Sequence, residues 1–328
     1  MESASRIQSC AIPSIDFSCL AGLLSCPDDG SQLVCTRSSI ECHSCRRRFL
    51  ISDDGVADLL PLRSKGIPDT RNPVYWHEYA QEFRRPYVPK PNSIAWGAPE
   101  VWDTSWVRKR FRQVHAVRPL IADSQFSKSH VFCDIAAGAG NYTLSYASAF
   151  RIVLHCDLSA DNLSYAARKA KRLGIRNVFF LRVDYFSLPF TNVLDRVVCF
   201  DTLIRGEQHE IALLGSVRKA MKPDARAVVD FHNWWHNPLR RLGLLPQNFG
   251  ENRSYKRKAA ECVLQAAGIH KFEFFPFYQE FDADSKGIRI AAVILRPTRL
   301  LFRFQGAVTG AVRTAASLRP ALEEFHVA

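Results

Sequence analysis

The sequence predicts an α/β protein. We expect a mostly parallel sheet of seven strands with an antiparallel last strand, preceded by a small β-rich element. Short apolar runs alternate with helical patterns between about residues 101 and 296. Such alternation is typical of a parallel sheet covered by helices. The last two β runs are joined only by the segment DADSK, which favours an antiparallel pair at the end.

Composition along the chain indicates four segments. Residues 20–62 combine turn formers with short β-like runs, and residues 63–100 form an irregular connector rich in Pro and Gly. The α/β pattern occupies residues 101–296. Residues 297–328 place apolar side chains at helical steps, which predicts a C-terminal amphipathic helix docked on its own domain. An anionic membrane surface or a partner protein is the alternative for that helix.

The boundaries of each element come from apolar runs, capping residues and turn formers. Ser159 is expected to cap a helix that Gly174 ends, and a further helix follows the Gly-x-Gly. The other helices are expected at Thr104–Ile121, Glu207–Met221 and Ser254–Ala267, and the strands at His130–Asp134, Arg151–Asp157, Asn177–Val183, Leu194–Phe200, Arg226–Phe231, Lys271–Glu280 and Gly287–Leu295.

Charge and hydropathy narrow the class of protein. The net charge of +12 suits an acidic partner such as RNA, but Lys and Arg are scattered in small groups that are more typical of solvated helix faces. No apolar run is long enough for a transmembrane helix. The N-terminal stretch MESASRIQSC lacks the pattern of a secretory signal. We therefore expect a soluble, cytoplasmic protein.

Three acids follow three successive predicted strands. Asp134 opens the spacing D-x-A-x-G-x-G with Ala136, Gly138 and Gly140; Asp157 ends 153-VLHCD-157, and Asp184 stands in 181-LRVDYFSLPF-190. Glycines let a backbone approach a ligand closely, and ligands bind beyond the carboxyl ends of parallel strands. The glycine motif alone is also compatible with a dinucleotide or with strand–helix packing.

Together, these motifs resemble the class I S-adenosylmethionine (SAM)-dependent methyltransferases, of the type 11/25-like group, over about residues 101–296. The resemblance implies that the glycine loop approaches the methionine part of SAM. It further implies that Asp134 lies near the amino group of SAM, that Asp157 accepts both ribose hydroxyls and that Asp184 meets the adenine amino group. Leu158, Tyr185 and Asp201 complete the expected cofactor-binding set. One departure is Lys222-Pro223-Asp224-Ala225, where the family normally has two glycines.

The segment 230-DFHNWWHNPLRR-241 follows the fifth predicted strand, where an acceptor would bind. Histidine is the side chain whose ordinary pKa best suits base chemistry near neutral pH, and His232 is our candidate catalytic residue. A simple hydrogen bond to its own loop is the alternative for His232. Trp234 and Trp235 are expected either to line an acceptor pocket or to pack the loop.

Six of the ten cysteines lie in the first 45 residues. The pattern L-x-C-P-x-x-G-x-L followed by C-H-S-C resembles the N-terminal zinc ribbon of 23S rRNA guanine methyltransferases, and a small tRNA-methyltransferase activator has a related ribbon. The resemblance implies a structural zinc held by Cys26, Asp29, Cys42 and Cys45, with Asp29 in the place of a cysteine. Cys35 is a substitute ligand outside the usual spacing, and a metal-free ribbon is the alternative.

The resemblance leaves three functions open. We favour methylation of a small-molecule acceptor such as a metabolite, a sugar or a natural-product intermediate, because of the aromatic His-containing segment and because the sequence has no Asn-Pro-Pro-Tyr motif. The ribbon and the net charge instead favour methylation of an rRNA or tRNA base. A catalytically inactive binding or activator subunit is the third option, against which the intact acids argue.

Overall fold

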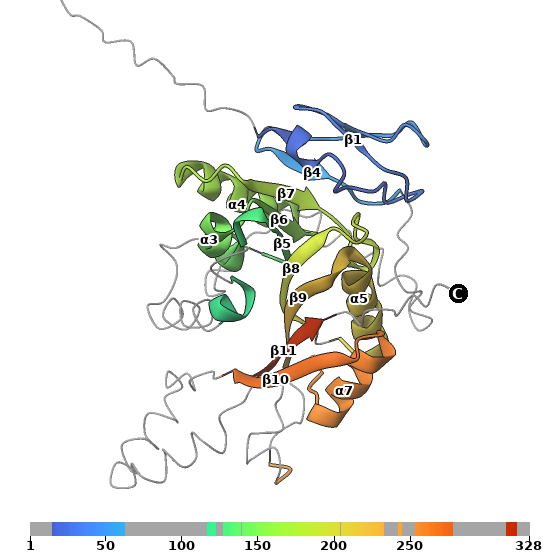
Figure 1. The fold of residues 1–328 in the computed structure, drawn as a ribbon, viewed down its shortest axis with the longest axis vertical. Helices are drawn as coiled ribbons and strands as arrows, with labels where there is room; N and C mark the ends of the chain where they lie inside the picture. The colour runs from blue at the N-terminus through green and yellow to red at the C-terminus, as the bar shows by residue number, and fades with distance from the viewer. Residues whose placement is uncertain are drawn as a thin grey trace, which may run out of the picture.

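The computed structural model describes residues 15–62, 117–122, 127–138, 140–203, 205–232, 242–244, 253–277 and 313–319. Two sheets organise these residues (Figure 1). The small sheet has the order β1-β2-β3, and the large sheet has the order β10-β11-β9-β8-β5-β6-β7-β4. The strands are β1 (Val34–Cys35), β2 (Ile40–Glu41), β3 (Arg48–Phe49), β4 (Val56–Asp58), β5 (Val131–Ile135), β6 (Ile152–Asp157), β7 (Val178–Arg182), β8 (Leu194–Leu203), β9 (Met221–His232), β10 (Lys271–Phe277) and β11 (Arg313–Arg319).

The central strands and helices lie close to their predicted bounds, except that β9 begins at Met221 and so includes Lys222 and Pro223, where a turn was predicted. The strands β5 to β9 are mutually parallel, as the alternating pattern predicted. Helix α4 (Ala160–Arg172) begins after Ser159, whose side chain accepts from the Asn162 N–H, and Gly174 follows with a φ of 69°. The remaining helices are α3 (Asn141–Tyr146), α5 (Glu207–Ala220) and α7 (Arg257–Ala266), with single 3-10 turns η1 (Phe17–Leu20), η3 (Ser127–Ser129), η4 (Ala147–Ala149) and η5 (Tyr185–Ser187).

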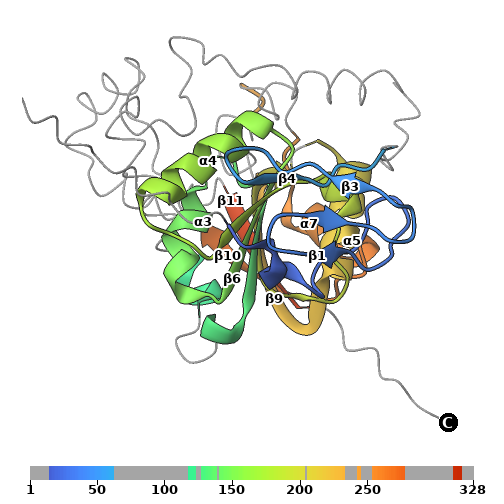
Figure 2. The same cartoon turned by 90° about the horizontal axis from the view of Figure 1, so that it is seen from above.

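Helices cover both faces of the large sheet. Figure 2 shows α3 and α4 on one side and α5 and α7 on the other. Each side has its own apolar cluster. Val117 and Ile121, from a helical turn at residues 117–121, join Tyr146 and Leu163 on the α3/α4 side. The apolar side chains of α5 and α7 pack on the opposite side together with those of the N-terminal element.

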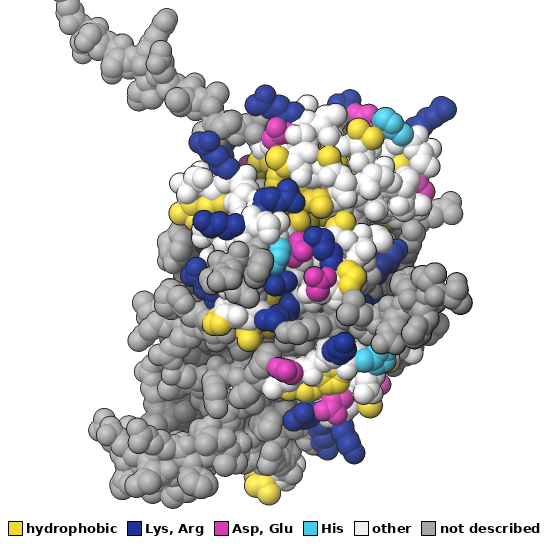
Figure 3. Space-filling view, in the orientation of Figure 1, with side chains coloured by type: hydrophobic (Ala, Val, Ile, Leu, Met, Phe, Trp, Pro, Cys, Tyr) yellow, Lys and Arg dark blue, Asp and Glu magenta, His cyan; other side chains and the backbone are white. Residues whose placement is uncertain are grey.

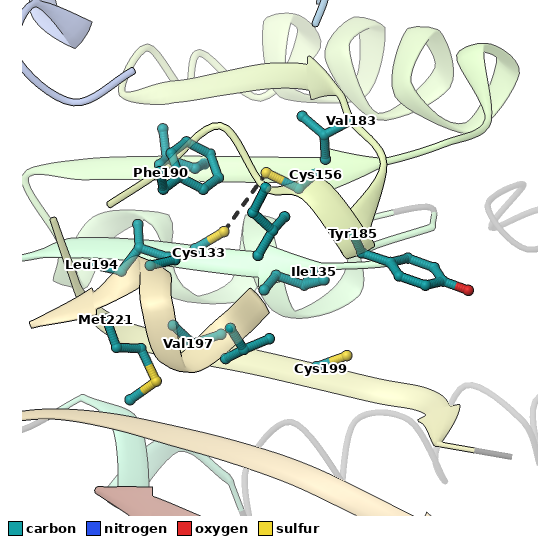
Figure 4. Close-up of a cluster of buried hydrophobic side chains, with 14 of the residues drawn as sticks. Cys133, Ile135, Cys156, Val183, Tyr185, Phe190, Leu194, Val197, Cys199 and Met221 are labelled. Carbon is teal, nitrogen blue, oxygen red and sulfur yellow. Dashed lines mark hydrogen bonds between the residues drawn. The ribbon is translucent and has the colours of Figure 1, made fainter. Parts of the chain in front are cut away.

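Cysteine thiols fill part of the core on the α5/α7 side. Cys133 and Cys156 lie on the adjacent strands β5 and β6, with their Sγ atoms 3.7 Å apart (Figure 4). Cys199 is also fully buried. Burial raises the pKa of Cys133 well above its ordinary value. Cys133 therefore stays protonated, and the three buried thiols act as small apolar side chains.

One strand of the N-terminal element, β4, joins the large sheet, which the sequence did not predict. Strand β4 pairs in parallel with β7, matching Val56 with Phe180 and Asp58 with Arg182. The Leu59 N–H extends this pairing by donating to the Arg182 carbonyl at 2.8 Å. Arg182 also donates to the Asp58 carboxylate at 3.0 Å. The sheet consequently has eight strands, because β4 satisfies the backbone groups at the edge of β7.

The predicted C-terminal helix over 297–328 is wrong for residues 313–319, which form β11. This strand pairs antiparallel with β9 on one side and with β10 on the other. Two rows of backbone hydrogen bonds outweigh the weak helix propensity of a tail that contains Gly306 and Gly310. The antiparallel strand was predicted at Gly287–Leu295, and that range lies outside the described residues, as do the connector and most of Thr104–Ile121.

No helix within the described ranges is both long enough and apolar enough to cross a membrane.

Candidate functional site

The predicted acids gather at the carboxyl edge of the large sheet. Asp134 is the fourth residue of β5, Asp157 is the last residue of β6, and Asp184 follows β7 by two residues. Because these strands are adjacent and parallel, their carboxyl ends lie side by side. Three acids from distant parts of the sequence therefore meet along one edge, where ligands bind in open α/β sheets.

The loop between β5 and α3 adopts a backbone that favours glycine. Ala136, Gly138 and Gly140 all have positive φ, of 55°, 53° and 79°. A Cβ at Gly138 would meet no atom within 4 Å, whereas a Cβ at Gly140 would lie 3.3 Å from His155 Cε1. Gly140 is therefore needed for packing, and Gly138 keeps open the space in which the resemblance expects SAM. The residues present fit that cofactor.

Asp157 fixes this loop. One carboxylate oxygen accepts from the Gly138 N–H at 2.7 Å, and the other accepts from the Ser159 N–H at 2.8 Å. Burial raises the pKa of Asp157, and these hydrogen bonds oppose the shift. A carboxylate has about four acceptor sites, so the remaining lone pairs can accept from the hydroxyls of a ribose.

Asp134 is turned towards the protein interior. It is buried, and its Oδ2 accepts from the Thr143 N–H at 2.9 Å and lies 2.6 Å from Thr143 Oγ1. Burial raises the pKa of Asp134 to about 7, although the Thr143 contacts act in the opposite direction. The structure therefore gives Asp134 a role in holding the first turn of α3, which the sequence did not suggest.

His155 is a residue of this region that the sequence reasoning missed. It lies in β6, is fully buried, and contacts both Thr143 and the Gly138 carbonyl. The signal was present in 153-VLHCD-157, where a histidine interrupts an apolar run. A polar side chain inside a buried strand needs hydrogen-bond partners, but the sequence does not name them.

The segment after β7 is compact. Asp184 accepts from the Phe186 N–H at 2.9 Å and so caps η5. The Tyr185 hydroxyl lies 3.0 Å from His209 Nε2 on α5. Burial, followed by the charge of Arg205, lowers the pKa of His209 to about 4. The carbonyl of Leu158 accepts from Arg182 Nε at 3.0 Å, which ties the end of β6 to β7.

The two remaining predicted residues lie on the neighbouring strands of the same sheet. Asp201 belongs to β8, and the structure describes its backbone. His232 is the last residue of β9 and is buried. Its carbonyl accepts from the Tyr255 N–H at 2.8 Å, which connects the end of β9 to the segment before α7. Trp234 and Trp235 lie outside the described residues.

A second group of chemically active side chains lies in the N-terminal element. Ligand atoms of Cys26, Asp29, Cys42 and Cys45 all lie within 4.8 Å of one another. The sulfurs of Cys26 and Cys45 are 3.8 Å apart, and Cys42 Sγ lies 3.4 Å from Asp29 Oδ2. A tetrahedral zinc with Zn–S bonds of about 2.3 Å separates its sulfurs by about 3.8 Å. The predicted set of three thiols and one carboxylate is thus assembled, and Cys35 lies outside it.

Local hydrogen bonds prepare this metal set. Asp29 accepts from the side chain and the backbone N–H of Ser31, and these bonds hold its pKa below the ordinary range. Burial alone would raise the pKa of Cys42, but bonds from Ser31 and from the Cys45 N–H lower it overall. Burial raises the pKa of Cys26 to about 12. Bound zinc would have to displace that proton.

A hollow of about 480 Å³ lies between the N-terminal element and the later turns of α4. Asp53 and Asp54 line one side, and Arg168 and Lys171 line the other. Since α4 begins at the carboxyl edge, these later turns are remote from the glycine loop. The hollow is therefore separate from the site built by the three acids.

Comparison with known proteins agrees with this geometry. Residues 132–224 match a family described as a methyltransferase domain. Those residues include the glycine loop, Asp134, Asp157, Asp184 and Asp201. No curated protein matches the chain in a sequence search.

Several solved structures are similar in fold. A geranyl diphosphate C-methyltransferase from Streptomyces coelicolor has 13% identity and a TM-score of 0.49, covering 74% of this chain and 96% of the other. Magnesium protoporphyrin IX methyltransferase from Synechocystis has 18% identity and a TM-score of 0.44, covering 75% and 96%. Phosphoethanolamine N-methyltransferase 2 from Haemonchus contortus has 15% identity and a TM-score of 0.44, covering 65% of this chain and only 53% of its own length.

The parallel sheet, the glycine loop and the acids at the strand ends are those of a class I methyltransferase fold, and residues 132–224 within that sheet match the methyltransferase-domain family. A zinc-ribbon-like element precedes this domain.

Proposed function

We propose that the protein transfers the methyl group of SAM to a small-molecule acceptor at the carboxyl edge of the sheet. The observation that carries this proposal is the loop at Gly138. Asp157 holds its N–H at 2.7 Å, and a Cβ at this position would enter open space. His232 ends β9 on the same edge. Donor and acceptor would therefore meet between these strand ends.

Bound SAM supplies an electrophilic methyl group on a sulfonium sulfur. Asp157 would orient the ribose through its remaining acceptor sites, and the Gly138 backbone would lie against the methionine part. Holding donor and acceptor in line accounts for much of the acceleration in such displacements. His232 would accept a proton if the acceptor is a hydroxyl or an amine that loses one during the reaction.

The choice of a small molecule is supported by the chain around His232. The segment 230-DFHNWWHNPLRR-241 offers aromatic side chains and histidines of the kind that line pockets for small ligands. The sequence also contains no Asn-Pro-Pro-Tyr motif, a catalytic signature of some nucleic-acid methyltransferases.

Methylation of an RNA base is the second candidate. The metal set in the N-terminal element and the net charge of +12 favour it. On the face shown in Figure 3, Lys and Arg side chains extend over the N-terminal element and the sheet domain, with Asp and Glu among them. A dispersed arrangement of this kind is weaker support than a continuous basic groove.

Methyl-labelled SAM distinguishes these functions. The protein would be incubated with a small-molecule extract and, separately, with total RNA from the same cells. We expect label in the small-molecule fraction and none when Asp157→Ala replaces the wild type. Label in RNA, with binding that weakens steeply as salt rises, would favour the second candidate. SAM binding without transfer to either fraction would favour a binding subunit.

A further inference from the structure

His155 lies directly beneath the glycine loop. It is fully buried in β6, where its ring lies 5.2 Å from the ring of Phe180 on β7. Its Cε1 would be 3.3 Å from a Cβ at Gly140, so the ring is in close contact with the loop. Neither the family pattern in the sequence nor the expected cofactor set includes this residue.

Both ring nitrogens of His155 are engaged. Nε2 lies 3.1 Å from the Gly138 carbonyl oxygen, and Nδ1 lies 2.8 Å from Thr143 Oγ1. Thr143 Oγ1 in turn lies 2.6 Å from Asp134 Oδ2. These contacts form a continuous buried chain from Asp134 through Thr143 and His155 to the loop.

Counting hydrogens determines the direction of this chain. A carbonyl oxygen only accepts, so His155 Nε2 has to carry the hydrogen that binds Gly138. In the neutral ring Nδ1 then accepts, and the Thr143 hydroxyl donates to it. Thr143 has one hydroxyl hydrogen, which can be donated either to Asp134 Oδ2 or to His155 Nδ1. When it is donated to His155, a protonated Asp134 has to donate to Thr143 Oγ1.

The electrostatics of the region agree with that count. Burial raises the pKa of Asp134 to about 7 and lowers the pKa of His155 to about 3. Asp157 is the charged neighbour that adds to the shift of Asp134. A neutral acid and a neutral imidazole are therefore the favoured forms between about pH 3 and pH 7, and each of the three contacts then contains one hydrogen.

His155 and Asp157 act on the same residue of the loop. They are two positions apart on β6 and hence project from one face of the strand. Asp157 accepts from the Gly138 N–H at 2.7 Å, and His155 Nε2 lies 3.1 Å from the Gly138 carbonyl oxygen. Both backbone polar groups of a residue with φ of 53° are thus held by one strand.

We propose that His155 is a positioning residue for the SAM site, which holds the Gly138 carbonyl so that the loop is preformed for the cofactor. This role rests on the proposed function, because it concerns the same loop. Its value would lie in preorganisation: a loop already held in the binding geometry loses less conformational freedom when the ligand arrives.

The first test measures SAM affinity by calorimetry. His155→Leu removes the donor to Gly138, and we expect SAM to bind about tenfold more weakly or worse. His155→Gln keeps an N–H donor and should stay within about threefold of the wild type. Leu154→Ala is the matched control: it removes a buried side chain from the adjacent position of β6, which packs on the opposite face of the sheet. Leu154→Ala should lower the melting temperature without weakening the binding of SAM. Unchanged affinity in His155→Leu would overturn the proposal.

The second test needs no cofactor. Nitrogen-15 NMR of the unliganded wild-type protein should report the Nε2–H tautomer of His155, and the Nδ1–H tautomer would contradict the chain. If His155→Leu does not fold, Thr143→Val interrupts the chain one step earlier. Thr143→Val should weaken the binding of SAM, and Thr143→Ser should bind SAM as the wild type does. Equal SAM affinities in these two variants would count against the hydrogen-bond chain. If the wild-type protein shows the Nε2–H tautomer of His155 but binds no SAM, the proposed function and the role of His155 in SAM binding are both refuted. The hydrogen-bond chain itself would still be supported by that tautomer.

Discussion

The carboxylate of Asp157 accepts a hydrogen bond from the backbone N–H of Gly138 at 2.7 Å. The sequence placed these residues 19 positions apart, on two strand ends. Their contact means that the acid expected to bind the ribose also sets the position of the loop expected to bind the methionine part. Two halves of the cofactor site are therefore coupled before any ligand binds.

Replacing Asp157 should consequently weaken the binding of SAM by more than the loss of the ribose contacts alone would. We expect Asp157→Ala to raise the Kd by at least about 100-fold, since hydrogen bonds to a charged group contribute about 1.5–3 kcal/mol each. Calorimetry measures this change. Asp161→Ala is a suitable control, because Asp161 is an exposed residue four positions later in α4. A comparable loss in both variants would argue against a specific role for Asp157.

The two glycines should respond differently to alanine. A Cβ at Gly138 meets no protein atom, so Gly138→Ala should cost only the strain of a positive φ, about 1–2 kcal/mol, while SAM binding falls sharply. At Gly140 the added Cβ adjoins His155, Ala166 and Leu144, and stability should fall further. Melting temperature and SAM affinity, measured on both variants, separate the effects. Wild-type SAM affinity in Gly138→Ala would mean that the open space does not hold the cofactor.

The N-terminal element should bind about one equivalent of zinc. Cys42→Ser should lose the metal, and Asp29→Cys should bind it more tightly by completing four thiolates. Affinity should rise with pH, because zinc displaces the proton of Cys26, whose pKa burial raises to about 12. Elemental analysis and competition with a chelator measure these effects. The Cys35→Ala variant should still bind zinc. Loss of zinc from this variant would show that Cys35 is one of the ligands.

Asp134 and His155 make opposing contributions to the pH dependence of stability. The pKa of Asp134 rises from 3.8 to about 7, so the folded state holds a proton that the unfolded state has lost, and stability falls as pH increases through that window. The pKa of His155 falls from 6.5 to about 3, so the unfolded state holds the extra proton, and stability increases with pH. The two contributions nearly cancel between about pH 4 and 6.5.

Removing one partner should expose the contribution of the other. Relative to the wild type, the free energy of unfolding of His155→Leu should fall by up to about 1.4 kcal/mol per pH unit between about pH 3 and 6.5, where His155 no longer contributes. Asp134→Asn should show the opposite slope relative to the wild type between about pH 4 and 7. Urea unfolding at several pH values gives both slopes. Parallel pH profiles for the two variants and the wild type would show that the pair does not titrate in this way.

Truncation after Pro297 should lower the melting temperature strongly. It removes β11, whose backbone pairs with both β9 and β10. Liposome pelleting of the full-length protein should show no binding, since the described part of this tail is occupied in the sheet. Unchanged melting of the truncated protein, together with pelleting of the full-length protein, would instead favour the membrane alternative.

The sequence predicted the centre of the fold well and its edges poorly. Strands β5 to β9 are each at least five residues long and are built around short apolar runs, so their signal is local. β4 is only three residues long, and its partner on β7 lies more than a hundred positions away. The sequence of β11 favours neither a helix nor a strand strongly. It forms a strand because its backbone pairs with β10 on one side and with β9 on the other.

The site follows the same division. The glycines and acids of the candidate site could be proposed from the sequence because their spacing along the chain carries the motif. The inward turn of Asp134 and the contacts of His155 depend on which side chains the sheet brings together, and no local pattern encodes those neighbours. Ser31, which orders both Asp29 and Cys42 in the metal set, was missed for that reason as well.

The position of β11 has a consequence for how the chain is made. Synthesis proceeds from the N-terminus, and β10 reaches the sheet only through β11, which is inserted between it and β9. Within the described sheet, β10 can therefore join only after residues 313–319 have left the ribosome. A nascent chain stalled before residue 313 would expose the edge of β9, with its row of unsatisfied amides and carbonyls, to any strand nearby. Chaperones and proteases that bind exposed strand edges would therefore recognise a copy that lacks residues 313–319.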